Sequence, residues 1–250
     1  MTIGLFLVLV AIFVGSVAQR IAGLGFSLLV APFLVMLLGA HEGVVMVLVC
    51  GLVSSVLVTV RVWRHVEWRS LLWIAVPAAI ATVPASLLAR WLPSAPLAII
   101  VSVLVLVALA VSVVLQRTRV VVRGPAPMGL TGVLSGATNA LAGVGGPAVS
   151  AYAVLSRWPQ RSFAATLQPY FVLLNIVTLT VKFSLDPGQS PSFGPLLWAA
   201  ITAIIVVGIV VGERCQRYVR DDHARTAVVI LAFTGALIAL IKPIAELTGA

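Results

Sequence analysis

The chain has 250 residues, of which 61% are hydrophobic and only 9% are charged. A soluble domain has about a quarter of its residues charged, and one with so few charges would expose large apolar areas to water and aggregate. The formal net charge of +9 lies on basic residues in short segments between apolar runs, which membrane topology explains better than nucleic-acid binding. The composition therefore predicts an all-α polytopic membrane protein that partners the lipid bilayer and no nucleic acid.

The first apolar stretch, residues 3–39, is interrupted by Gln19-Arg20 and then by Ala22-Gly23-Leu24-Gly25. It lacks the basic n-region of a secretory signal, so we expect it to stay in the mature protein as two short helices joined at the glycine-rich break. Three longer apolar runs follow at 43–60, 70–89 and 96–115. Each approaches the length that crosses the hydrocarbon, since a helix rises about 1.5 Å per residue over about 30 Å.

The second half of the chain repeats this order. The apolar stretch 128–156 is broken by Asn139 and by Ala142-Gly143-Val144-Gly145-Gly146-Pro147, and its pieces are too short to cross singly. Three apolar runs follow at 162–181, 193–212 and 226–242. A shift of 120 residues places the first break on the second.

The same shift aligns two side-chain amides, Gln19 and Asn139. We therefore interpret residues 1–117 and 124–250 as two halves of a duplicated membrane domain, joined by a cytoplasmic linker at 118–123.

Basic residues favour the cytoplasmic loops of membrane proteins. Three, three, two and four arginines lie in the segments 61–69, 116–127, 157–161 and 213–225. Arg20 is set aside, and the other side then holds only Arg90, Lys182 from a loop at 182–193, and Lys242. This assignment alternates across all six long helices, and it predicts that both chain termini lie outside the cytoplasm.

With this assignment, each broken helix pair enters and leaves on the same face of the membrane. Each half then holds one pair and three crossings, an odd number, so the two halves have opposite orientations. Such inverted repeats are common in secondary transporters. We prefer re-entrant pairs, which turn back inside the bilayer, because the second pair is short; two full crossings give the same parity.

Glycine-rich interruptions at membrane depth are tolerated only where they pack in protein or line a polar cavity. The helices that start near Gly25 and Pro147 present free backbone N–H groups and positive dipole ends, which together form an anion site without needing a lysine. The predicted substrate-binding residues are Gln19, Arg20, Gly23, Gly25, Asn139, Gly143, Gly145, Gly146, Pro147, Gln168 and Asn175.

Each of these residue types has a structural alternative. Arg20 either faces the cavity or caps a crossing helix and snorkels to the surface. Glycine clusters also serve close helix packing. Gln168 and Asn175 are seven residues apart, hence on one helix face, where they either line the pathway or hydrogen-bond to a neighbouring helix.

The sequence contains no set of residues with metal-ligand spacing and no cofactor motif, and we expect neither a metal nor a cofactor. The three histidines stand alone, and Cys50 and Cys215 lie in opposite environments that argue against a disulfide. No His/Asp/Ser constellation converges either, so we expect no enzyme.

Two signatures resemble those of the sulfite exporter TauE/SafE family. The first is Gly23-Leu24-Gly25-Phe26 followed by Pro32-Phe33-Leu34, with Phe26 and Ser27 where further glycines often occur. The second is Gly143-Val144-Gly145-Gly146-Pro147, with Tyr152 and then Ser162-Phe163-Ala164-Ala165-Thr166. The resemblance covers nearly the whole chain and implies a bacterial plasma-membrane transporter of small sulfur-containing or organic anions, such as sulfite, sulfoacetate or other sulfonates.

The leading hypothesis is a secondary carrier for a small anion, working in export or import. An anion channel and a non-transport membrane assembly factor are the alternatives. The sequence leaves open the exact substrate, the coupling ion and whether the protein forms a homo-oligomer.

Overall fold

A computed structural model describes residues 2–22, 26–115, 120–186, 193–215 and 221–248, which are almost entirely helical and contain no strand. The predicted all-α class is therefore confirmed. In these residues the α-helices are α1 (Thr2–Ala22), α2 (Phe26–Leu38), α3 (Ala40–Val62), α4 (Trp68–Trp91), α5 (Ser94–Leu115), α6 (Pro125–Ala142), α7 (Gly146–Ser156), α8 (Gln160–Leu185), α9 (Pro195–Cys215) and α10 (Asp221–Thr248). One 3-10 turn, η1 (Trp63–His65), follows α3.

Five helices, α3, α4, α5, α8 and α9, are long and apolar enough to cross a membrane. Shorter apolar helical segments lie in α1, α2 and α10. The helix α7 has 11 residues and thus a length of about 16 Å, roughly half the hydrocarbon thickness. Its short length makes α7 the element of a broken pair that ends inside the bundle.

Helix boundaries in the first half recur at a constant spacing in the second half. The helix α1 ends at Ala22 and α6 at Ala142, and their successors α2 and α7 begin at Phe26 and Gly146. The helices α3 and α8 begin at Ala40 and Gln160. Each of these pairs of boundaries differs by 120 residues, so the shift seen in the sequence also describes where the backbone breaks.

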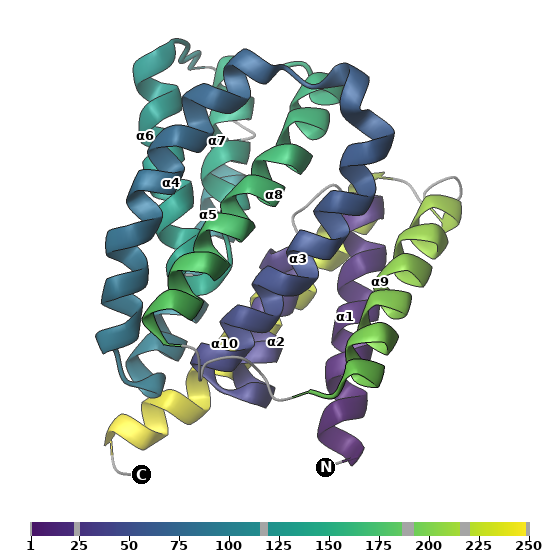
Figure 1. The fold of residues 1–250 in the computed structure, drawn as a ribbon, viewed down its shortest axis with the longest axis vertical. Helices are drawn as coiled ribbons and strands as arrows, with labels where there is room; N and C mark the ends of the chain where they lie inside the picture. Colours follow the sequence, from purple (N-terminus) through teal and green to yellow (C-terminus); the bar gives the residue numbers. More distant parts are fainter. Residues whose placement is uncertain (1, 23–25, 116–119, 187–192, 216–220, 249–250) are drawn as a thin grey trace.

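Helix packing follows the same correspondence. The helix α4 packs on α6 and its counterpart α9 packs on α1, while α5 packs on α7 and α10 packs on α2. Two further contacts join counterparts directly, α3 with α8 and α5 with α10. Figure 1 shows α3 and α8 side by side in the middle of the bundle. These contacts are the ones expected from two related halves packed against each other.

The described parts of the arginine-rich segments lie at one end of the molecule. Arg61 forms a 2.8 Å ion pair with Glu213, and the Trp158 indole N–H donates to Glu67 Oε1 at 2.9 Å. Arg123 Nε donates to the Ser156 carbonyl at 2.8 Å, which brings the start of α6 and the end of α7 to the same face. This second broken pair thus enters and leaves at one end, as predicted.

The opposite end holds the α2–α3 and α4–α5 connections. His41 at the start of α3 lies 3.2 Å from the Leu92 carbonyl, between α4 and α5. Figure 1 shows that α1 begins and α10 ends at this end, away from the α3–α4 connection. One prediction was wrong here: Lys182 lies inside α8, which continues to Leu185, and not in a loop. Its side chain is buried, which a loop would not have achieved.

Candidate functional site

The second helix break is fixed by backbone geometry at Gly143. This residue follows the end of α6 and adopts φ +69°, while its N–H donates to the Asn139 carbonyl at 2.8 Å. Side-chain-bearing residues rarely adopt this left-handed conformation. A Cβ at Gly143 would also lie only 2.9 Å from Val47 Cγ1 of α3. Glycine is therefore required here both by the turn and by the close approach of α3.

The start of α7 is fastened to α6 by a chain of hydroxyl groups. The Ser135 hydroxyl donates to the Gly145 carbonyl at 2.6 Å, and the Tyr170 hydroxyl donates to Ser135 Oγ at 2.6 Å. A Cβ at Gly145 would stand 2.9 Å from Ser135 Oγ and 3.2 Å from Asn139 Cβ. The chain turns back tightly at this point because Gly145 lacks a side chain.

No side chain caps the start of α7. Gly145 occupies the N-cap position, Gly146 and Pro147 open the helix, and no described side chain accepts a capping hydrogen bond from the first N–H groups. The first N–H groups of a helix have no intrahelical partner and carry the positive end of the dipole. Gly146 lies beside Phe171 of α8, 3.7 Å from a Cβ built on the glycine. The uncapped end therefore lies next to Phe171, a residue that also lines the cavity described below.

Two buried amides join α6 to α8 at this depth. Asn139 and Asn175 are only 2% and 4% exposed, and Asn139 Nδ2 donates to Asn175 Oδ1 at 3.1 Å. The same nitrogen lies 3.2 Å from Thr178 Oγ1, whose hydroxyl donates to the Leu174 carbonyl. Asn175 stands near the middle of α8, so these polar groups lie deep in the bundle.

The amides open on a small cavity of about 30 Å³, which we call the break pocket. It is lined from α1, α2, α3, α6 and α8 and by the second break itself. The lining residues are Gln19, Phe26, Ser27, Val47, Gly51, Ser55, Asn139, Gly143, Phe171 and Asn175.

Several lining residues form pairs separated by 120 positions. Gln19 pairs with Asn139, Gly51 with Phe171, and Ser55 with Asn175. Both members of each pair line the same cavity, although they come from different halves of the chain. The break pocket therefore lies where the two halves meet.

Gln19, which lies three residues before the end of α1, lines this pocket next to the first break. Its Oε1 accepts a 3.0 Å hydrogen bond from the Ser54 hydroxyl of α3, as the Asn139 amide bonds to α8 in the other half. Gly23 and Gly25 lie outside the described residues, and so does the side chain of Arg20, which follows Gln19 in α1. The structure thus brings Gln19 together with Asn139, Gly143 and Asn175 of the predicted site.

Other predicted residues lie outside the lining of the break pocket. Pro147 borders a separate, mostly apolar cavity between α5, α6 and α7. Gln168 stands seven residues before Asn175 in α8, and its Oε1 is buried without a hydrogen-bond partner in the described part of the chain. Asn175 forms the hydrogen bond to a neighbouring helix that was one of the two interpretations, and it also lines the break pocket.

Sequence reasoning missed Ser27, Ser55 and the brace formed by Tyr170 and Ser135. A signal for Ser55 existed, since the 120-residue shift carries Asn175 onto it. No comparable signal marks Tyr170, because a tyrosine in an apolar run also suits ordinary packing.

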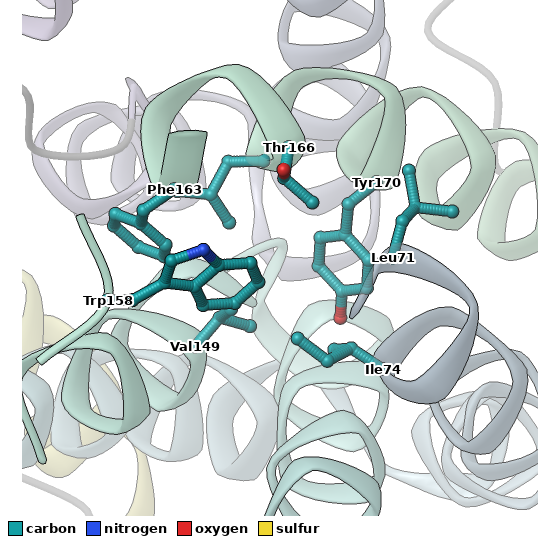
Figure 2. Close-up of a pocket in the computed structure, with 8 residues that line it drawn as sticks. Leu71, Ile74, Val149, Trp158, Phe163, Thr166 and Tyr170 are labelled. Carbon is teal, nitrogen blue, oxygen red and sulfur yellow. The ribbon is translucent and has the colours of Figure 1, made fainter. Parts of the chain in front are cut away.

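A second enclosure, between α4, α7 and α8, is a packing region without a free polar group (Figure 2). It has no room for a water molecule. Its polar atoms are satisfied elsewhere: Trp158 donates to Glu67, Thr166 Oγ1 accepts from the Glu67 N–H at 2.9 Å, and Tyr170 donates to Ser135. This enclosure therefore supports α7 and has no free group with which to bind an anion.

The described residues contain no group of three or more His, Cys, Asp or Glu side chains placed to hold a metal ion.

Comparison with known proteins gives one match. A family model described as Sulfite exporter TauE/SafE matches residues 7–238. No curated protein and no solved structure matches the chain significantly. The matched range includes both helix breaks and every residue that lines the break pocket.

Proposed function

Because the chain belongs to the sulfite exporter TauE/SafE family, we propose that it is a secondary carrier for a small sulfur-containing or organic anion. Sulfite, sulfoacetate and other sulfonates are the proposed substrates, and the break pocket is the proposed binding site. The membrane is the plasma membrane of a bacterium. The observation that supports this site most strongly is that polar residues from both halves line one buried cavity.

The chemistry of the break pocket suits an anion of low charge. The polar side chains among its described lining residues are amides and hydroxyls, without a carboxylate. An oxyanion accepts hydrogen bonds from such donors, and hydrogen bonds to charged groups are stronger than those between neutral partners. The uncapped start of α7 adds backbone N–H groups and a favourable dipole beside Phe171.

The small size of the pocket favours a carrier over a channel. A cavity of about 30 Å³ holds roughly two water molecules, too few to accommodate an oxyanion of four or more heavy atoms. The site must therefore widen to admit its substrate. Alternating access requires such a change, whereas an open channel would present a continuous pore.

The orientation of the two halves belongs to the same proposal. The end that holds Arg61, Arg123 and Arg157 faces the cytoplasm, as positively charged loops do. The proposed inversion of the two halves is supported by the places where their first helices begin, α6 at this end and α1 at the other. Cysteine labelling of intact cells tests the orientation, and a cytoplasmic position for both termini would contradict it.

The decisive experiment is transport by purified protein in liposomes, with radiolabelled sulfite and sulfoacetate. We expect saturable uptake and counterflow, in which unlabelled anion inside drives entry of labelled anion. Fast, non-saturating flux without counterflow would instead indicate a channel. Absence of flux for every oxyanion tested would favour an assembly factor and overturn the proposal.

A further inference from the structure

Lys182 is a buried cation on the helix that carries Asn175. Lys182 is only 3% exposed, although it lies one turn from the end of α8. A lysine near the end of a membrane helix normally extends its ammonium group to the water interface. The low exposure shows that Lys182 does not do this and instead lies inside the bundle.

Burial removes the Lys182 ammonium from the water that would solvate it at the membrane surface. His41 at the start of α3 interacts electrostatically with both Lys182 and Asp186, the residue that follows α8. Burial of a charge is costly, and charged residues inside membrane segments commonly mark substrate pathways. The position of Lys182 therefore calls for an anionic partner.

Spacing places Lys182 in line with the amides of the break pocket. It follows Thr178 by four residues and Asn175 by seven, so the three side chains project from one face of α8. At about 1.5 Å per residue, Lys182 stands roughly 6 Å beyond Thr178 and roughly 10 Å beyond Asn175 along the helix. It lies on the side of the pocket that faces the end with few basic residues.

We propose that Lys182 forms a second anion-binding position, between the break pocket and the extracellular face. The inference rests on the proposed transport of a small oxyanion. It adds to the proposed binding site a residue that belongs to neither helix break. An anion bound there pairs with the ammonium and passes to the Asn139 and Asn175 amides when the pocket opens. Lys182 thus supplies a positive charge next to the amides and hydroxyls of the break pocket.

The test compares sulfite counterflow by the wild type, Lys182→Met and Lys182→Arg in liposomes. We expect Lys182→Met to raise the half-saturating sulfite concentration about 10- to 100-fold, as loss of one charged hydrogen bond does, and Lys182→Arg to retain most of the affinity. The thermal stability of Lys182→Met should equal or exceed that of the wild type, because a buried charge has been replaced by an apolar side chain of similar length. A purely structural lysine would give the reverse, a less stable protein with unchanged affinity.

The matched control is Arg90→Gln, which removes one positive charge from an exposed residue at the same end of the molecule. It should leave the half-saturating concentration unchanged. An equal effect of both variants would reduce the role of Lys182 to surface charge and overturn the inference. Failure of the proposed function is distinguishable, because the wild type itself would then show no saturable counterflow.

A second measurement needs no substitution. The chain has only two lysines, so acylation of Lys182 and Lys242 is easily separated by mass spectrometry. Sulfoacetate should slow acylation of Lys182 in the wild-type protein while Lys242 serves as the internal reference. Equal rates with and without sulfoacetate, or a Lys182 that no reagent reaches, would contradict an anion position at this residue.

Discussion

The two broken helix pairs, α1–α2 and α6–α7, share a register but are held by different forces. In the second pair, Tyr170 donates to Ser135 and Ser135 donates to the carbonyl of the break. The 120-residue shift carries Ser135 onto Gly15 and Tyr170 onto Cys50, neither of which has a hydroxyl group. At Gly15 the space that a side chain would fill is occupied by Val30 of α2.

The far end of the second pair is braced in the same way. Trp158, just after α7, donates to Glu67, and Arg123, just before α6, donates to the Ser156 carbonyl. The counterpart of Trp158 in the first half is Leu38, which has no polar group. The two pairs thus share the positions of their helix boundaries but differ in the interactions that stabilise them. Loss of a hydrogen bond should weaken the second pair, and a change of volume should weaken the first.

The largest effect is expected at the breaks themselves. Gly145→Val should abolish transport while the protein still reaches the membrane, because a side chain there collides with Ser135 and Asn139. Gly25→Val, outside the described residues, should do the same if the halves are equivalent. Gly129→Val is the control, since a Cβ at that position meets its nearest neighbour, Pro77, at 3.8 Å. Normal transport by both break variants would make the glycines packing features.

The next largest effect should come from a negative charge in the break pocket. Asn139→Asp should raise the half-saturating anion concentration at least about 100-fold, because like charges about 4 Å apart repel by about 4 kcal/mol at a partly buried site. Gln19→Glu should act in the same direction but more weakly, since Gln19 is less buried. Thr138→Val, whose hydroxyl bonds only to carbonyls of its own helix, should leave flux unchanged. Equal affinity of Asn139→Asp and wild type would place the substrate elsewhere.

A smaller effect is expected from the hydroxyl brace. Tyr170→Phe removes the bond to Ser135 and should lower the free energy of unfolding by about 1 kcal/mol, with a matching fall in melting temperature in detergent. Tyr152→Phe removes a hydroxyl that bonds to no described residue and should change stability less. If Tyr170→Phe and Tyr152→Phe are equally stable, the hydroxyl brace does not stabilise the pair α6–α7, and the proposed difference from α1–α2 is wrong.

The smallest effect should be the pH dependence contributed by Glu67, which lies outside the membrane-spanning helices. Partial burial raises the pKa of Glu67, but hydrogen bonds from Ser162, Trp158 and Ser70 outweigh it and hold the pKa below its usual value. A carboxyl with a depressed pKa contributes stability above its unfolded pKa, and that contribution is lost as the pH falls through the folded value. Glu67→Gln should therefore be less stable than wild type at neutral pH, by less than about 1 kcal/mol.

The check is thermal unfolding of both proteins at neutral pH and near pH 3, with Glu213→Gln as a control for removal of one acidic charge at the same end. The difference between wild type and Glu67→Gln should shrink in acid. A difference independent of pH would mean that the carboxylate charge plays no part in holding the end of α7.

The sequence alone determined the number and order of the helices, the two breaks and the segregation of the arginines to one end. These features can be recognised from short stretches of sequence, because a helix that crosses lipid must be about 20 apolar residues long and must form all its backbone hydrogen bonds internally. For example, α2 ends at Leu38, and the next residue, Gly39, is the glycine that ends the apolar stretch in the sequence.

Only the tertiary structure decided which side chains meet. Gln19, Ser55 and Asn175 come from three helices, and their common cavity depends on how those helices rotate and pack. The same packing buries Lys182, which the sequence placed in a loop because a charge ends an apolar run. A helix period fixes the face on which a residue lies, but the neighbour that covers this face is set by contacts between distant segments.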